Sequence, residues 1–169
     1  MARESPRPPS LPEPPKVDRR IRIPAHRAVG LALIALVPVL AVLGVFGERR
    51  NTADAAAGAV AVQVEYPTRY RYEMLNSITA TVTNRSARLI DTVVVRLDSA
   101  YTLRFSAVVF TPAAERAFAV PLTDLAPGET RLVEIELQGE RYGRHSGDLH
   151  FESTTGDTLV VPLRTVIFP

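Results

Sequence analysis

The stretch ITATVTNRSARLIDTVVVRLD, residues 78–98, alternates apolar with polar side chains on both sides of a short polar segment at residues 84–87. Successive side chains of a strand point to opposite faces, so every second residue shares a face. Two apolar sets follow from this spacing: Ile78, Ala80 and Val82, then Val93, Val95 and Leu97. The pattern predicts two consecutive strands, each with one side in a core and with a turn between them.

The same alternation, interrupted by turn signals, continues through residues 59–169. No helical period separates the apolar stretches, which favours an all-β antiparallel sandwich or barrel. About 110 residues is an ordinary size for such a fold. The predicted strands are residues 59–65, 77–83, 92–98, 103–110, 117–122, 130–137, 148–152 and 158–168.

Two short motifs carry a resemblance to a known family. The turn at Asn84–Ala87 joins early strands, and the segment LAPGET, residues 125–130, precedes a later strand. Over residues 60–167 the chain resembles the bacterial immunoglobulin-like modules related to CARDB and NEW3 domains. The resemblance implies an immunoglobulin-like β-sandwich that acts as an adhesive or spacer module and carries no catalytic residues. This chain departs from the family pattern in having a single module.

Residues 28–47 read AVGLALIALVPVLAVLGVFG and contain no charged or strongly polar side chain. A helix of this length covers about 30 Å, which is the thickness of the hydrocarbon core of a bilayer. We therefore predict one transmembrane helix before the sandwich, kinked at Pro38. Because the run holds no His, Met, Asp, Glu or Lys, it offers no side chain for a bound cofactor or a proton pathway.

Basic residues flank this run unevenly. Those shortly before it are Lys16, Arg19, Arg20, Arg22 and Arg27, and those shortly after it are Arg49 and Arg50. The positive-inside rule then predicts a cytoplasmic N-terminus and a periplasmic sandwich at a bacterial inner membrane. A cleaved secretory signal is the alternative, since Ala53 with Ala55, or Ala59 with Ala61, gives a small-residue cleavage pattern. The long basic region and the long apolar run favour a retained anchor.

The segments around the helix have separate expected roles. Residues 1–27 form a Pro- and Arg-rich arm that we expect to be disordered or extended. Residues 48–58 are expected to be a connector to the sandwich at residues 59–169. The arginines expected to contact lipid head groups are Arg19, Arg20, Arg22 and Arg27. Small residues that share one side of the helix are Gly30, Ala41 and Gly44, and they indicate either helix packing or the ordinary composition of a membrane span.

The segment YPTRYRY, residues 66–72, is a candidate interaction site. In an extended chain its tyrosines project to one side and its arginines to the other, and both residue types are enriched at binding hot spots. The candidate residues are Tyr66, Arg69, Tyr70, Arg71 and Tyr72. The alternative is that the tyrosines cover the edge of the sandwich.

Composition and charge restrict the chemistry. The chain has no cysteine, which excludes a disulfide scaffold, a Cys-ligated metal and a thiol nucleophile. Asp148, His150 and Glu152 share one face of a predicted strand and would suit zinc or manganese. A solvent-facing polar side opposite Leu149 and Phe151 gives the same pattern, and we favour that interpretation. We assign no catalytic, metal or cofactor-binding residues and expect no cofactor.

These observations predict a class of function. The positive charge lies in the arm and the rest of the chain is mildly acidic, which argues against a nucleic-acid partner. We expect a non-catalytic, single-span accessory subunit of a larger bacterial membrane complex, with membrane lipids and other subunits as partners. Respiratory and photosynthetic complexes are assemblies that recruit such subunits, and no residue here selects between them. The alternative is a membrane-anchored periplasmic module that binds an exported protein or an envelope component. An enzyme is the least favoured class.

Overall fold

The structure is a computed structural model that describes residues 24–44 and 47–169. Its contacts divide the chain into two compact units, with the division between Leu40 and Ala41. Most of the predicted arm, residues 1–23, lies outside the described residues, so its expected disorder stays a prediction.

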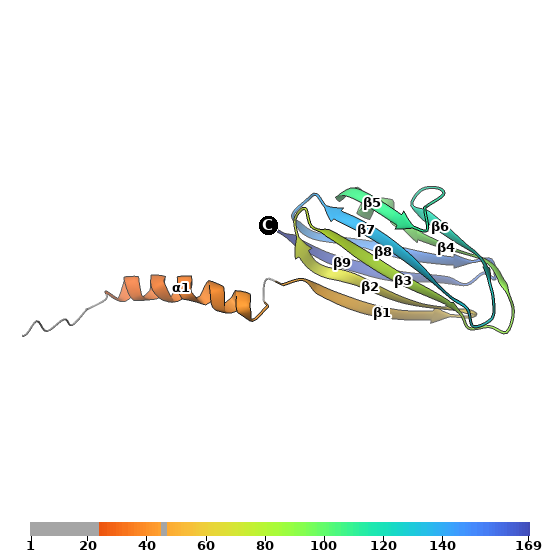
Figure 1. The fold of residues 1–169 in the computed structure, drawn as a ribbon, viewed down its shortest axis with the longest axis horizontal. Helices are drawn as coiled ribbons and strands as arrows, with labels where there is room; N and C mark the ends of the chain where they lie inside the picture. The colour runs from red at the N-terminus through yellow and green to blue at the C-terminus, as the bar shows by residue number, and fades with distance from the viewer. Residues whose placement is uncertain (1–23, 45–46) are drawn as a thin grey trace, which may run out of the picture. The chain divides into compact units, whose positions relative to one another are not determined.

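Helix α1 (Ala25–Val42) is the one long helix among the described residues (Figure 1). It begins after Pro24, whose carbonyl oxygen accepts hydrogen bonds from the N–H groups of Arg27 at 2.9 Å and Ala28 at 3.1 Å. Pro38 lies inside the helix without ending it. The helix stops before Gly44, whose φ of 73° is a left-handed conformation that favours glycine. A helix is therefore confirmed here, but it starts and ends earlier than the predicted residues 28–47.

The second unit is built from nine strands and one short helix. Within the described residues, these elements follow one another with no other helix between them. They are β1 (Arg49–Ala57), β2 (Val60–Arg71), β3 (Leu75–Asn84), β4 (Ile90–Leu97), α2 (Ser99–Thr102), β5 (Phe105–Thr111), β6 (Ala119–Leu125), β7 (Thr130–Gly139), β8 (Gly143–Ser153) and β9 (Thr158–Phe168).

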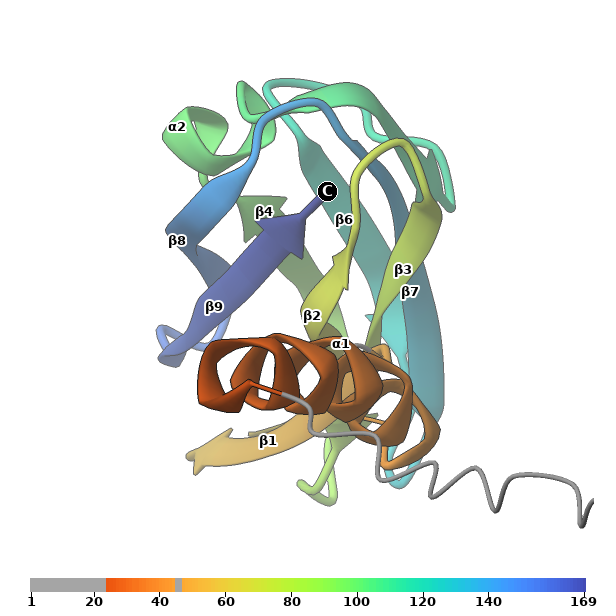
Figure 2. The ribbon, with the colours of Figure 1, turned by 90° about the vertical axis from the view of Figure 1, so that its left-hand side faces the viewer.

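The strands form two layers joined through β2. One layer runs β1, β2, β3, β7, β5, and the other runs β9, β8, β4, β6. Figure 2 shows β8 and β9 on one side of the core and β3 and β7 on the other. The ladders are antiparallel except for one short parallel pairing, in which Arg69–Arg71 of β2 lie beside Val166–Phe168 of β9. The predicted all-β, immunoglobulin-like sandwich is confirmed.

Strand β2 changes partner along its length. Residues 60–65 pair with β3, whereas residues 69–71 pair with β9 in the other layer. Pro67 lies between the two pairings and has no N–H to donate to a ladder, so it suits the position where β2 leaves one neighbour for the next.

All eight predicted strands are present, and β9 has the predicted bounds. The ninth strand, β1, corrects the sequence prediction, because it lies within residues 48–58 that were expected to be a connector. Residues 49–57 pair with β2 along the whole of β1. The sequence RRNTADAAA has no contrast between apolar and polar positions, and β1 is a strand because β2 offers it a partner.

The alternating apolar residues form the core as the sequence predicts. Ile78, Val93 and Val95 are among the fully buried side chains. At the end of β3 this apolar series finishes with Asn84, a polar residue that is also fully buried. Its side-chain amide donates hydrogen bonds to the carbonyl oxygens of Arg88 at 2.7 Å and Leu125 at 2.8 Å.

Candidate functional site

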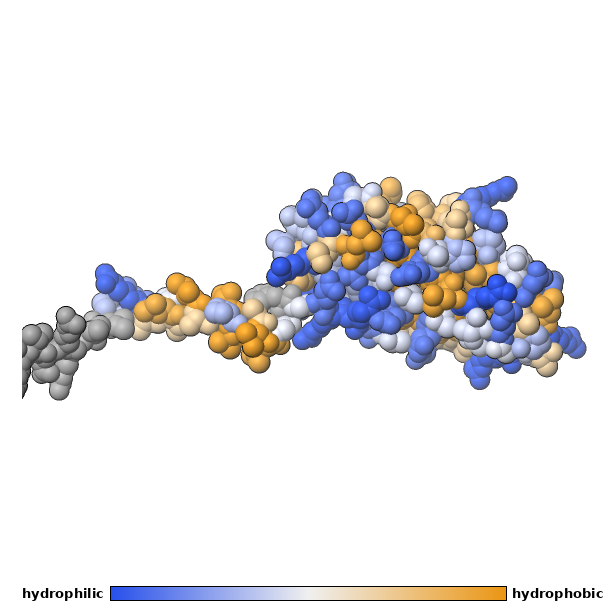
Figure 3. Space-filling model, viewed as in Figure 1, coloured by the Kyte–Doolittle hydropathy of each residue, from blue (hydrophilic) through white to orange (hydrophobic). Residues whose placement is uncertain are grey.

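The exposed apolar surface of α1 is the first candidate. None of its residues is buried, and Ile34 is 72% exposed. Apolar side chains cover most of this helix in Figure 3, with hydrophilic residues at its N-terminal end, whereas the β-unit shows a mixture of hydrophilic and hydrophobic residues. Among the described residues, one helix is long and apolar enough to cross a membrane, and a signal sequence near an N-terminus would pass the same test.

The residues predicted to contact lipid head groups or to pack the helix lie in different places. Arg27 is exposed in the first turn of α1, and Arg19, Arg20 and Arg22 lie outside the described residues. Gly30 lies within α1, and apart from the adjacent residues and the nearby helix backbone no atom lies within 4 Å of the position that a Cβ would take there. Gly44 follows the end of α1, which corrects its assignment to the helical stripe, and its positive φ explains the glycine.

The tyrosine segment of β2 is largely internal. Tyr66 is 6% exposed and Tyr70 is 0% exposed, so these two residues are not available to a partner as the sequence predicted. The predicted division into two sides is present, but the tyrosine side faces the core. Arg71 is exposed and Tyr72 is half-buried, so these side chains remain at the surface.

A buried polar cluster surrounds the position where β2 changes layers. The hydroxyl groups of Tyr101 and Thr165 lie 2.9 Å apart, and the Thr165 hydroxyl donates to the carbonyl oxygen of Pro67 at 2.8 Å. Burial raises the pKa of Tyr101 to about 12. Burial, with a smaller contribution from Tyr101, also raises the pKa of Tyr70, whose hydroxyl is the one buried side-chain polar atom without a hydrogen-bond partner in the described chain.

Loops meet at the end of the sandwich where β1 begins, and we call this the anchor-side end. It comprises residues 72–75, 102–104, 140–142 and 168–169 together with Arg49. The N–H of Tyr72 donates to the carbonyl oxygen of Phe168 at 2.8 Å, and the N–H of Glu140 donates to that of Arg104 at 3.4 Å. The rings of Tyr72 and Tyr142 have their centroids 4.6 Å apart. These contacts join the four loop segments into one surface.

Large apolar side chains protrude from the anchor-side end. Their exposed fractions are 48% for Met74, 59% for Leu75, 73% for Leu103 and 57% for Tyr142. These four residues were not predicted from the sequence as functional candidates. The available signal was that apolar residues occupy positions at or beside turns, where polar residues are usual.

The acidic and histidine residues of β8 face outward. Leu149 is 0% exposed and Phe151 is 1% exposed, which confirms the predicted division of this strand into two faces. Glu152 pairs with Arg96 of β4 at 3.1 Å. Within residues 24–44 and 47–169, no three His, Asp or Glu side chains are grouped closely enough to hold a metal ion.

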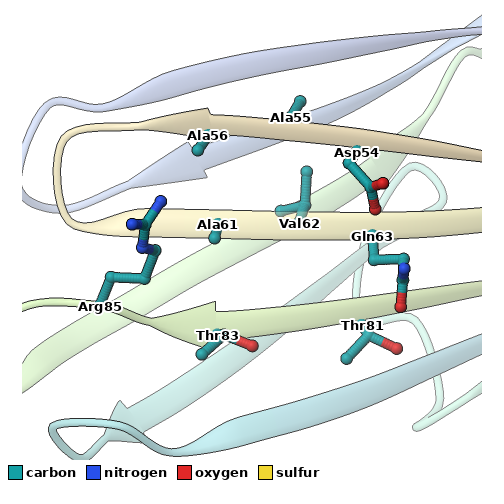
Figure 4. A pocket seen from close by; sticks show the side chains of 9 residues that line it. All are labelled: Asp54, Ala55, Ala56, Ala61, Val62, Gln63, Thr81, Thr83 and Arg85. Atoms are coloured by element: carbon teal, nitrogen blue, oxygen red, sulfur yellow. The ribbon is translucent and has the colours of Figure 1, made fainter.

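A shallow groove lies on the outer face of β1, β2 and β3. Its volume is about 450 Å³, and Figure 4 shows side chains from three neighbouring strands along it, together with Arg85 from the turn after β3. Its polar groups come from Asp54, Gln63, Thr81, Thr83 and Arg85. A second groove, of about 410 Å³, lies between β5 and residues 113–118.

Comparisons with known proteins identify no family for this chain but find solved structures that are similar to it. No protein-family model matches the chain, and no curated protein matches it. A solved cohesin module of a Clostridium perfringens family 33 glycoside hydrolase is 8% identical, with 69% of this chain and 98% of that chain covered and a TM-score of 0.40.

Two further solved structures are similar at the same level. The GAE domain of GGA2p from Saccharomyces cerevisiae is 10% identical, with 72% of this chain and 98% of that chain covered and a TM-score of 0.34. The cupredoxin domain of amoB from Nitrosocaldus yellowstonii is 9% identical, with a TM-score of 0.39. That match covers 56% of each chain, so this chain spans little more than half of that relative's length.

Proposed function

We propose that the protein is a non-catalytic, single-span accessory subunit of a larger bacterial membrane complex. The observation that carries this proposal is α1, an 18-residue apolar helix with no buried residue, joined to a β-sandwich by a short stretch of chain. Lipid would cover such a helix, and the sandwich would then be held close to the membrane.

The position of β1 supports a retained anchor over a cleaved signal. Ala53 and Ala55, which form one candidate cleavage pattern, lie inside β1, and Ala61 of the other lies in β2. Cleavage after Ala55 would remove most of a strand that pairs with β2 along its whole length. Cleavage after Ala61 would remove β1 entirely. A retained helix keeps this layer of the sandwich complete.

The proposed orientation has the arm in the cytoplasm and the sandwich in the periplasm. It rests on the basic residues before α1 and follows the positive-inside rule. Because the chain has no cysteine, single-cysteine variants give an unambiguous test. Ser10→Cys and Thr155→Cys should react differently with a membrane-impermeant maleimide on intact spheroplasts: labelling at residue 155 and none at residue 10 is expected. The reverse labelling would refute this orientation.

The role as a subunit is tested by purifying the full chain from native membranes in mild detergent. We expect it to migrate with other membrane proteins in fixed stoichiometry, far above the size of an 18.5 kDa chain. Resistance of the membrane-bound protein to carbonate extraction should accompany this result. A protein that resists carbonate but runs as a lone monomer would contradict the subunit role and leave the anchor intact.

The alternative is a membrane-anchored periplasmic module that binds an exported protein or an envelope component. The groove on β1, β2 and β3 favours it, because Asp54, Gln63 and Arg85 offer both hydrogen-bond donors and acceptors there. A lone monomer in detergent that captures a periplasmic protein would support this function. Loss of capture in Arg85→Ala, with capture retained in Arg88→Ala, would place the binding at the groove.

A further inference from the structure

We propose that the anchor-side end of the sandwich is a lipid-contacting surface that rests on anionic head groups. The inference deepens the proposed function, since it rests on α1 being a membrane anchor. It assigns a role to four exposed residues that the anchor alone does not need: Met74, Leu75, Leu103 and Tyr142.

The reach of the chain brings this end to the membrane. Strand β1 begins at Arg49, seven residues after α1 ends at Val42. Seven residues span at most about 25 Å even when fully extended. The start of β1 lies within the anchor-side end, because Arg49 is paired with Arg69 beside the last residues of β9. If α1 crosses a bilayer, this end of the sandwich is therefore held within reach of the head groups.

The side chains at this end suit an interface between water and lipid. The paired rings of Tyr72 and Tyr142 combine an apolar body with a hydroxyl group, which is the chemistry enriched where proteins meet head groups. Leu103 is 73% exposed and Leu75 is 59% exposed, so both can enter the outer part of the acyl region. If this end faced only water, these apolar side chains would have no apolar group to contact.

The charges at this end favour an anionic surface. Three arginines lie there, namely Arg49, Arg104 and Arg141, against the two acidic residues Glu73 and Glu140. Arg71 and Glu48, one of each sign, adjoin this end. The turns at the opposite end, residues 85–89, 126–129 and 154–157, carry two basic and two acidic residues. Anionic lipids attract basic groups near their surface. The difference in charge between the two ends would therefore orient the sandwich with its anchor-side end toward the membrane.

The mixture of residues indicates lipid as the occupant. Charged residues lie next to exposed apolar ones here: Glu73 precedes Met74, and Arg104 follows Leu103. The core of a protein interface is depleted of charged residues, whereas charged residues directly adjoin the exposed apolar ones at this end. A head-group layer accepts both the charged and the apolar groups.

The test uses the absence of tryptophan from the chain. Tyr142→Trp and Leu103→Trp place single reporters at the anchor-side end, and Leu89→Trp is the matched control at the opposite end, where Leu89 is 51% exposed. A ten-residue strand separates the two ends by about 33 Å. Each full-chain variant is reconstituted in vesicles of phosphatidylcholine with one quarter phosphatidylglycerol, with and without phosphatidylcholine brominated on its acyl chains.

We expect brominated lipid to quench Trp at 142 and at 103 and to leave Trp at 89 unquenched. Replacing phosphatidylglycerol with phosphatidylcholine should weaken the quenching. In Arg104→Gln/Arg141→Gln this dependence on lipid charge should be lost, whereas the control Arg85→Gln/Arg88→Gln should retain it. Equal quenching at all three positions, or none at 142 and 103, would overturn the inference.

Carbonate extraction of the same vesicles separates this inference from the proposed anchor. Release of the protein would refute the anchor and the inference together. A protein that stays inserted but shows no quenching at 142 and 103 would refute only the lipid contact. A partner protein at this surface would be indicated if the cysteine of Leu103→Cys reacts with maleimide in pure lipid vesicles but is protected from it in native membranes. That result would also overturn the lipid assignment.

Discussion

Asn84 links the turn at residues 84–87 to the segment LAPGET, residues 125–130. Its side-chain oxygen accepts hydrogen bonds from the N–H of Ser86 at 2.9 Å and from the hydroxyl of Ser86 at 2.7 Å. Its backbone N–H donates to the carbonyl of Glu129 at 3.0 Å, and its carbonyl accepts from the N–H of Gly128 at 2.9 Å. One buried polar residue therefore links the turn after β3 to the turn before β7.

Replacing Asn84 with Ala should destabilise the sandwich strongly. The change leaves the carbonyl groups of Arg88 and Leu125 without these donors, and the second of these bonds is buried. We expect the free energy of unfolding to fall by about 2–4 kcal/mol. Urea unfolding of the full chain in mild detergent measures it. Asn51→Ala, which removes a weak bond to Tyr66 at 3.3 Å, is the control, and an equal loss in both variants would contradict the role of Asn84.

Two buried tyrosines should respond in opposite directions to loss of their hydroxyl groups. Tyr70→Phe removes a buried hydroxyl that has no partner in the described residues, so the free energy of unfolding should rise by about 1 kcal/mol. Tyr101→Phe removes the bond to Thr165 and should lower it by a similar amount, about 1 kcal/mol. The same urea titration compares both variants. Stabilisation by Tyr101→Phe would show that the Thr165 contact contributes nothing.

At the scale of single elements, the turn before β7 depends on a charged residue. The Glu129 carboxylate accepts a hydrogen bond from the N–H of Ala126 at 2.9 Å and also pairs with Arg131. These contacts, the backbone bond first, lower the pKa of Glu129. A lowered folded-state pKa means that the stabilisation exists above the ordinary pKa of a glutamate and is lost as the pH falls through the folded value.

Glu129→Gln should therefore matter at neutral pH and not in acid. At pH 7 the variant should melt at a lower temperature than the unmodified chain, because it lacks the charge that Arg131 and the Ala126 N–H contact. The difference should shrink as the pH falls below about 4, where the native carboxylate also becomes protonated. Thermal melts followed by circular dichroism across this range test it. A difference that is constant with pH would contradict the charge-based explanation.

The strands show what the sequence could predict and what it could not. Alternation of β-branched and polar residues was sufficient for β3, β4, β7 and β9, because one face of each strand is buried. It was insufficient for β1, whose alanines give no contrast and whose conformation depends on pairing with β2. For residues 66–72 the alternation separated tyrosines from arginines correctly, but it carried no information about which side faced the core. The apolar loop residues that form the anchor-side end were missed because they come from segments distant in sequence.

On the scale of the whole molecule, its buried phenol groups limit stability in alkali. Burial raises the pKa of Tyr101 to about 12 and raises that of Tyr70 above its ordinary value. In the unfolded chain both groups lose their protons near pH 10. Above that pH the unfolded state therefore binds fewer protons than the folded state, so alkali favours unfolding.

The free energy of unfolding should accordingly fall as the pH rises from about 10 to 12, by up to about 1.4 kcal/mol per pH unit for each buried tyrosine. Urea titrations at successive pH values measure this slope. Tyr70→Phe should reduce the slope, since one of the two groups is removed. Tyr142→Phe, which changes an exposed hydroxyl, is the matched control and should leave it unchanged. An equal slope in Tyr70→Phe would contradict the contribution of Tyr70.

The end of β9, where the carbonyl oxygen of Phe168 accepts a hydrogen bond from the N–H of Tyr72, affects where a tag can be added to the protein. Because Arg49 and Phe168 both adjoin the 69–71 segment of β2, the polypeptide enters and leaves the sandwich on the same side. With the membrane anchor proposed above, an affinity tag or fluorescent reporter fused after Pro169 would start next to the bilayer, where antibodies and resins have little room. Insertion at Thr154–Gly156, a turn on the opposite side, would present the same tag to bulk solvent.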